Sequence, residues 1–214
     1  MLQAVKKDTE TGDDPLALKY LFVVQQIKSG VIPDAQVEKE LQTAMAAIAP
    51  QSVSSGDDAA ATQSSKVPPI QLDRLAECGR MAIKYGLINY AEGACNVLAR
   101  ASQGSLRAQI WTEYTKAELL LRKPSADIDP KTGMKLNTLQ RQFEDFERRV
   151  EALKIMDRAM IATRRLADPD LIIEGCYLIW NMSLPLVKNS TRSHTHKPFQ
   201  SAAQALESIQ ANDN

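Results

Sequence analysis

Two histidines close together in the sequence are the residues of this chain best suited to chemistry. His194 and His196 are the only 2 histidines among 214 residues, and they lie in the segment Arg192-Ser193-His194-Thr195-His196-Lys197. Two imidazoles at this spacing could supply part of a zinc site, but no Cys, Asp or Glu lies in the segment to complete the ligand set. We therefore expect the two histidines to be solvated or to face a partner, and we expect no metal and no cofactor.

The segment 188–197 around these histidines carries positive charge and no acid. Such a segment could bind an acidic surface, for example a tubulin tail. The alternative is a polar loop between two helices with no binding role. The candidate partner-binding residues are Lys188, Arg192, His194, His196 and Lys197.

The rest of the sequence offers no catalytic constellation. It contains no G-x-x-x-x-G-K-[ST] loop, no G-x-G-x-x-G pattern, no G-x-S-x-G elbow and no H-E-x-x-H motif. Glu144, Asp145 and Glu147 lie beside Arg148 and Arg149 in the sequence of one predicted long helix. The basic side of this helix, which includes Arg158, could bind a partner, but Glu151 and Asp157 interleave with it. Pairing within the helix explains the mixed charge without a catalytic or binding role, so we expect no enzymatic activity.

The composition favours a soluble intracellular protein of the cytoplasm. The chain has 26 Lys and Arg against 26 Asp and Glu, and 44% of its residues are apolar. A formal net charge of zero argues against a dedicated nucleic-acid binder. No apolar run is long enough for a membrane span, and the first residues lack the apolar core of a secretory signal. Cys78, Cys95 and Cys176 form no C-x-x-C pair and are expected to be buried apolar residues in a reducing compartment.

The elements that must position these residues are helices. Proline, glycine and capping residues divide the chain, and no stretch alternates with period two, so the predicted fold class is all-α. The predicted helices cover residues 14–30, 33–49, 69–85, 89–101, 105–123, 136–166, 168–186 and 198–210. Residues 51–66 carry one bulky apolar residue, which predicts a flexible linker, and a polar, mobile loop is expected at 125–135. The expected organisation is a tail and helical hairpin at 1–50, the linker at 51–68, a helical domain at 69–210 and a tail at 211–214.

Several residues are expected to begin or end these helices. Asn89 with Glu92 resembles a capping box, and Ser105 and Asp168 are the expected N-caps of the helices that follow them. Pro185 is expected to kink or fray the last turn of its helix. Gly30 should end its helix, and Gly86 should end its helix in the left-handed region.

Apolar residues at helical spacing predict the core. The long helix contributes Leu139, Phe143, Phe146, Val150, Leu153, Met156 and Met160, and the final helix contributes Phe199, Ala202, Leu206 and Ile209. Trp111 and Trp180 lie at core positions and are expected to be buried, the alternative being exposure in a groove.

The spacing of small residues resembles a tetratricopeptide repeat, in which small residues let two helices approach closely. Gly79 and Ala91 stand twelve apart, within the series Leu75, Cys78, Gly79, Ala82, Ala91, Cys95 and Leu98. Cys and Ala replace the aromatic residues of that repeat, so any Ala-rich hairpin is an alternative source of the pattern. The predicted architecture is a set of tetratricopeptide-like hairpins stacked as a short α-solenoid, with a compact helical bundle as the alternative.

The order of these features resembles a known family. The basic segment and a short amphipathic helix follow the stretch Glu174-Gly175-Cys176-Tyr177-Leu178-Ile179-Trp180-Asn181-Met182-Ser183-Leu184-Pro185-Leu186. Upstream of that stretch lies the long helix, which contains Phe143, Glu144 and Glu151-Ala152-Leu153. With the helix pair at 90–101 and 105–121, this resembles the N-terminal tetratricopeptide-like region of the cilia- and flagella-associated protein forty-six family. The resemblance covers about residues 69–210 and rests on helix order rather than on a strict motif.

That resemblance implies a structural role. Members of the family are very large scaffolds of the ciliary central apparatus with no known catalytic site, in contact with other projection proteins, calmodulin and the central-pair microtubule. This chain would then be a microtubule-associated cytoskeletal protein of the axoneme. Family members are many times longer than 214 residues, so the resemblance implies that the chain would be a fragment, a shortened relative or one piece of a split subunit. The N-terminal hairpin and the linker have no counterpart.

Three hypotheses follow. The first is a helical scaffold within a large assembly, which should leave a contiguous apolar surface exposed in the isolated chain. The second is a free-standing peptide-binding module, with polar groove residues from 73–84 and 107–116. The third is an enzyme, which an inward-facing carboxylate pair or a bound metal would support. We rank them in that order.

Overall fold

The structure of the chain is a computed structural model. It describes residues 26–27, 29–30, 33–48, 69–100, 105–122, 137–188 and 190–212. Most of the helix predicted at 14–30, the linker predicted at 51–66 and the loop predicted at 125–135 lie outside the described residues. The chain divides into two compact units, Met1–Gln63 and Ser64–Asn214, which are described separately.

In the first unit the described helix is α3, Asp34–Ile48. Val37, Leu41 and Ala44 are buried along one side of it, as the spacing of its apolar residues predicts. Gly30, which precedes this helix, has a φ of 69°, a backbone conformation that glycine adopts without a Cβ penalty.

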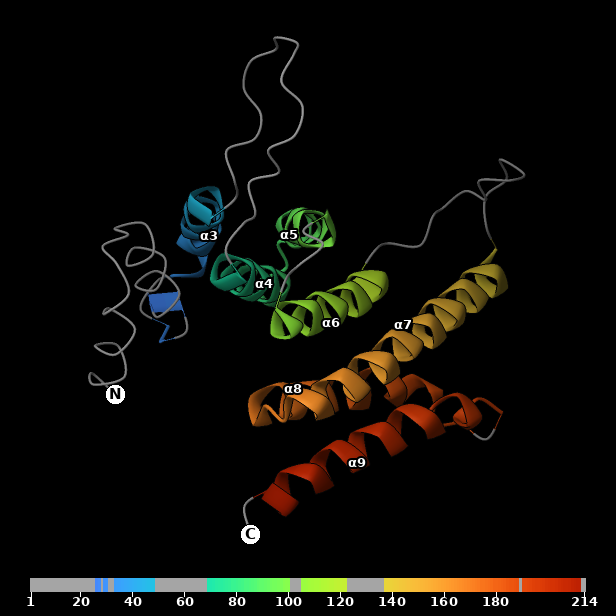
Figure 1. Ribbon diagram of the computed structural model, residues 1–214. Helices are drawn as coiled ribbons and strands as arrows, with labels where there is room; N and C mark the ends of the chain where they lie inside the picture. Colours follow the sequence, from blue (N-terminus) through green and yellow to red (C-terminus); the bar gives the residue numbers. More distant parts are fainter. Residues whose placement is uncertain are drawn as a thin grey trace, which may run out of the picture. The chain divides into compact units, whose positions relative to one another are not determined.

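The described part of the second unit is a succession of helices (Figure 1). Its helices are α4 Pro69–Lys84, α5 Ile88–Arg100, α6 Leu106–Arg122, α7 Thr138–Leu166, α8 Pro169–Ser183 and α9 His196–Asn212, with short 3-10 turns η1 Leu184–Leu186 and η2 Arg192–His194. Within the described ranges every regular element is helical, which confirms the predicted all-α fold class.

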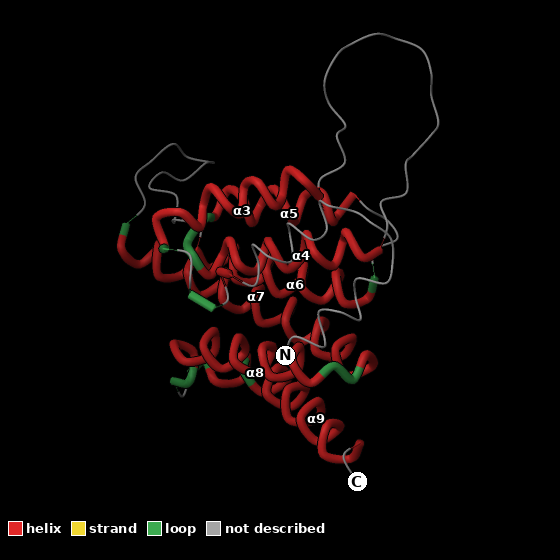
Figure 2. Tube along the Cα trace, turned by 90° about the vertical axis from the view of Figure 1, so that its left-hand side faces the viewer, coloured by secondary structure: helices red, strands yellow, loops and turns green. Residues whose placement is uncertain are grey.

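Each helix of this unit packs mainly against its nearest neighbours along the chain. α4 packs on α5 and α6, α6 packs on α7 and α8, and α7 packs on α8 and α9. Figure 2 shows this order from the side, with α5 nearest the top, α4 and then α6 below it, and α8 and α9 at the bottom. α5 also packs on α6, and α8 also packs on α9.

Most of the predicted helix ends are where the sequence places them. The Ser105 hydroxyl accepts the Ala108 N–H at 3.0 Å, and the Asp168 carboxylate accepts the N–H groups of Asp170 and Leu171 at 3.1 and 3.3 Å. Gly86 has a φ of 75°, as expected. α8 stops at Ser183, and the residues around Pro185 form η1, because proline cannot continue the hydrogen-bond ladder.

Three helix starts differ from the prediction, and one of them is that of α9, which begins at His196 and not at residue 198. α5 begins at Ile88, so Asn89 is its second residue and not its cap. Leu87 precedes the helix, and its carbonyl accepts the Ala91 N–H at 3.2 Å. α7 begins after Asn137, whose side chain accepts the Gln140 N–H while the Gln140 side chain accepts the Asn137 N–H. This capping box was not recognised in the sequence.

The core of the second unit surrounds Tyr114 of α6. Its ring is fully buried among α7, α8 and α9 residues such as Met156 and Ile179. The Tyr114 hydroxyl donates to the Leu171 carbonyl at 3.1 Å and lies 2.9 Å from the Thr163 hydroxyl. One hydroxyl thus joins α6, α7 and α8.

Small residues let the helices approach closely at two crossings. A Cβ added at Gly79 of α4 would lie 3.1 Å from the Cβ of Ala94 on α5. At Gly175 of α8 an added Cβ would overlap the Tyr114 hydroxyl and the Met160 sulfur. The predicted small position Ala91 is fully buried, although the residue opposite Gly79 is Ala94.

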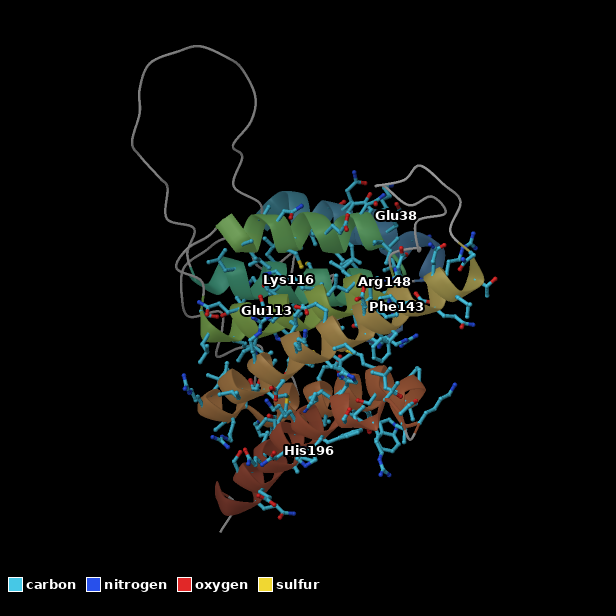
Figure 3. All side chains as sticks on the ribbon, turned by 90° about the vertical axis from the view of Figure 1, so that its right-hand side faces the viewer. Glu38, Glu113, Lys116, Phe143, Arg148 and His196 are labelled. Atoms are coloured by element: carbon cyan, nitrogen blue, oxygen red, sulfur yellow. The ribbon has the colours of Figure 1, made fainter. Side chains whose placement is uncertain are left out.

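Some predicted core residues are exposed. On α7, Leu139 is 75% and Phe143 60% exposed, because the buried residues of this helix run only from Ala152 to Thr163 (Figure 3 shows Phe143). Leu206 of α9 is 43% exposed, and Trp180 of α8 is 56% exposed. The expectation that Trp180 is buried was wrong, whereas Trp111 is partly buried against the core.

Candidate functional site

The basic segment predicted to bind a partner forms one wall of an open groove of about 1290 Å³. Residues 192–200, from η2 and the start of α9, lie along one side of it. Val150, Glu151, Lys154, Asp157 and Arg158 of α7 lie along the other side. We call this the basic groove.

Four of the five predicted partner-binding residues line the basic groove, namely Arg192, His194, His196 and Lys197. Lys188 is exposed but does not line it. The structure therefore brings the basic segment together with a stretch of α7 whose charges the sequence analysis assigned to pairing within the helix.

Hydrogen bonds hold the segment that forms the groove wall. The Thr191 hydroxyl donates to the Leu186 carbonyl at 2.8 Å, and the hydroxyl of the buried Thr195 donates to the Arg192 carbonyl at 2.8 Å. The His194 ring lies edge-on to the Phe146 ring of α7, with centroids 5.3 Å apart. The wall is thus fixed against α7 before any ligand binds.

His196 is the first residue of α9, and both histidines are exposed (Figure 3 shows His196). Among the residues that the structure describes, no group of three His, Cys, Asp or Glu side chains is arranged to hold a metal ion.

A second surface joins α8 and α9 and was missed by the sequence analysis. A groove of about 600 Å³ is lined by apolar residues throughout, namely Ile173, Cys176, Tyr177, Trp180, Phe199, Ala202, Ala203 and Leu206. Tyr177 is 65% exposed. The centroid of the Trp180 ring lies 6.0 Å from the centroid of the half-buried Phe199 ring. We call this surface the apolar strip.

The composition of α8 contains the signal that could have revealed this strip. Leu171, Gly175 and Ile179 are buried on one side of the helix, while Ile173, Tyr177 and Trp180 are apolar on the other. A helix that is apolar all round is normally covered on every side. α8 is covered on one side only by the described residues, so the other side is an exposed apolar surface.

The surface formed by α4, α6 and α8 carries ion pairs within the molecule. The Arg80 guanidinium of α4 pairs with Glu118 of α6 and, at 2.6 Å, with Glu174 of α8. It also lies 5.7 Å from the centroid of the Trp111 ring. On α6, Lys116 pairs with Glu113 at 2.7 Å (Figure 3).

Burial controls the titration of the cysteines and of Tyr114. Burial raises the pKa of the Cys95 thiol to about 11 and also raises the pKa of Cys176. It raises the pKa of the Tyr114 hydroxyl far above its ordinary value, against the opposing effect of the hydrogen bond with Thr163. Cys78 and Cys95 are buried as expected, whereas Cys176 is half-buried and lines the apolar strip. Cys95, Cys176 and Tyr114 stay protonated at neutral pH, which suits a packing role.

No helix of the described residues is long and apolar enough to cross a membrane. No protein-family model matches the chain, and no curated protein matches it. The basic groove and the apolar strip are therefore the features of this structure that bear on function.

Proposed function

We propose that this chain is a non-catalytic helical scaffold that docks other protein subunits of a larger assembly. The observation that carries the proposal is the apolar strip of α8 and α9. Single exposed apolar residues are ordinary on a protein surface, but a contiguous groove lined by apolar residues alone is typical of a site that binds another protein.

The packing order of the helices supports a stacked arrangement of tetratricopeptide-like hairpins. Contacts between each helix and the next two along the chain are what a short α-solenoid requires, because its repeats touch only their neighbours. In such a stack α8 covers α6 and α7 with the side that bears Gly175 and Ile179. The opposite side, with Tyr177 and Trp180, is then the place where a further helix would pack.

The chemistry of the strip identifies the kind of partner. Its lining carries no charged residue, and its two walls are helices. An amphipathic helix of another protein fits such a groove, with apolar residues at i, i+3, i+4 and i+7 against Tyr177, Trp180 and Leu206.

The alternative is a free-standing cytoplasmic adaptor that binds a peptide on α4 and α6. On that face Arg80, Glu118, Glu113 and Lys116 already pair with residues of this chain. A peptide would have to compete with those pairs, which favours the apolar strip as the docking surface.

The more specific proposal is a subunit of the ciliary or flagellar central apparatus, beside projection proteins, calmodulin and tubulin. It rests on the resemblance of residues 174–186 and of the helix order to the family named above. In that setting the chain would be a cytoskeletal protein of the axoneme that supports ciliary motility.

The test compares three tagged full-length chains in a flagellated cell after detergent extraction. They are the wild type, the strip variant Tyr177→Lys/Trp180→Lys, and the control Leu139→Lys/Phe143→Lys. The control residues are apolar side chains outside the strip with a similar exposed fraction. Leu139 is 75% and Phe143 60% exposed, whereas Tyr177 is 65% and Trp180 56% exposed. We expect the wild type and the control to remain along the axonemal midline and the strip variant to be extracted.

Each part of the proposal can fail separately. A wild type extracted within a large complex would contradict the axonemal location but not the scaffold role. A wild type extracted as a monomer would contradict both. Retention of the strip variant at the wild-type level would show that another surface docks the chain.

A further inference from the structure

The basic groove contains cationic side chains that no carboxylate of the described residues neutralises. Lys154 pairs with Glu151 at 3.3 Å, and Asp157 accepts a hydrogen bond from Ser201 at 2.5 Å. Within the described part of the chain, Arg158, Arg192 and Lys197 form no ion pair.

These three cations come from both walls of the groove. Arg158 lies on α7, whereas Arg192 and Lys197 lie on the opposite wall formed by η2 and the first turn of α9. Several charged residues elsewhere in the same unit are paired, for example Arg107 with Asp168 at 2.7 Å. Unpaired cations that face one space from two sides are suited to hold anionic groups between them.

The size of the basic groove favours an extended peptide chain over a small molecule as its ligand. Its volume of about 1290 Å³ exceeds the range typical of small-ligand pockets, about 300–1,000 Å³. The wall is also preformed by the bonds of Thr191 and Thr195, so a ligand need not order the loop.

We propose that the basic groove binds an acidic peptide segment of a partner protein, with its carboxylates held by Arg158, Arg192 and Lys197. The site goes beyond the proposed helix docking, because its ligand is recognised by charge and it meets the apolar strip only at Phe199.

The groove favours a peptide over a nucleic acid. Glu151 and Asp157 line the same space. They would repel a backbone that carries one negative charge per nucleotide, whereas a peptide can place neutral residues opposite them.

The test measures binding of a fluorescein-labelled Glu-rich decapeptide to the full-length chain by fluorescence anisotropy. The groove variant is Arg192→Glu/Lys197→Glu. The matched control is Arg164→Glu/Arg165→Glu, which makes the same charge change at exposed residues outside the groove. Circular dichroism checks that each variant is folded.

We expect saturable binding by the wild type that weakens as the salt concentration rises. The groove variant should bind at least about tenfold more weakly, a loss of about 1.4 kcal/mol, and the control should stay within about threefold. Arg158→Glu alone should also weaken binding, because it removes the cation of the opposite wall.

Three results would overturn the proposal. The first is no saturable binding of the decapeptide by the wild type. The second is an equal loss of affinity in the groove variant and in the control, which would show that the net charge of the chain, and not the groove, determines binding. The third is tighter binding of a single-stranded RNA decamer that the groove variant also abolishes, which would make the groove a nucleic-acid site.

Discussion

At Gly175, α8 packs closely on both α6 and α7. An added Cβ there would lie 2.9 Å from Tyr114 Cζ and closer still to the Tyr114 hydroxyl and the Met160 sulfur. The hydroxyl is itself fixed by bonds to Thr163 and Leu171, so it cannot move aside without losing them. Close packing at this one position thus depends on the absence of a side chain.

Gly175→Ala should lower the free energy of unfolding by about 1–3 kcal/mol, because the added methyl overpacks a full core. In an exposed helix the same change normally stabilises by about 1 kcal/mol. Gly93 of α5 provides that control, since a Cβ there meets nothing within 4 Å. Urea unfolding of both variants should therefore give shifts of opposite sign, and a stabilised Gly175→Ala chain would contradict the packing around Tyr114.

The three cysteines should differ in reactivity with a thiol reagent. At pH 8 a thiol with a pKa of about 11 is only about one-thousandth thiolate, so Cys95 should react slowly, and its rate should rise about tenfold per pH unit. Cys176 is half-buried and should react first, and the fully buried Cys78 should react only on unfolding. Mass spectrometry of timed alkylation checks this order, and a Cys78 as reactive as Cys176 would contradict it.

At the scale of the elements, the sequence predicted most helix ends well, but it predicted less well which side chains of each helix are buried. Ser105, Asp168 and Pro185 act through their own backbone neighbourhood, which the local sequence contains. The exposure of Leu139 depends on how far the neighbouring helices extend along α7, which is a property of the packed molecule.

Arg80 connects three helices and offers a test of their packing. Its side chain is 11% exposed and pairs with Glu118, which is 17% exposed, and with the more solvated Glu174. Arg80→Met should destabilise the chain by about 1–3 kcal/mol, because it leaves Glu118 with only the weaker pair to Arg122.

A double-mutant cycle separates the ion pair from the loss of side-chain packing. Arg80→Met combined with Glu118→Met should cost less than the sum of the two single changes, since no charge is then left without its partner. Strict additivity of the unfolding free energies would show that Arg80 and Glu118 are not coupled.

At the scale of the whole molecule, the sequence predicted one half of the basic groove. Arg192, His194, His196 and Lys197 stood out because they form a basic segment without an acid. Arg158 of the opposite wall was assigned to pairing within α7, because sequence spacing does not show which distant segment a helix face meets. The apolar strip was missed for a related reason, since apolar residues such as Trp180 are assigned to the core unless the covering elements are known.

The apolar strip lies in solvent in the isolated chain, and the proposed docking covers it with a partner helix in the assembly. Hydroxyl-radical footprinting of the purified chain and of the chain in its native complex tests this directly. Tyr177 and Trp180 should be oxidised readily in the purified chain and protected at least about fivefold in the complex. Phe143, an exposed apolar residue outside the strip, should be oxidised equally in both. Equal oxidation of Trp180 in the two samples would contradict the proposal that this surface docks the chain.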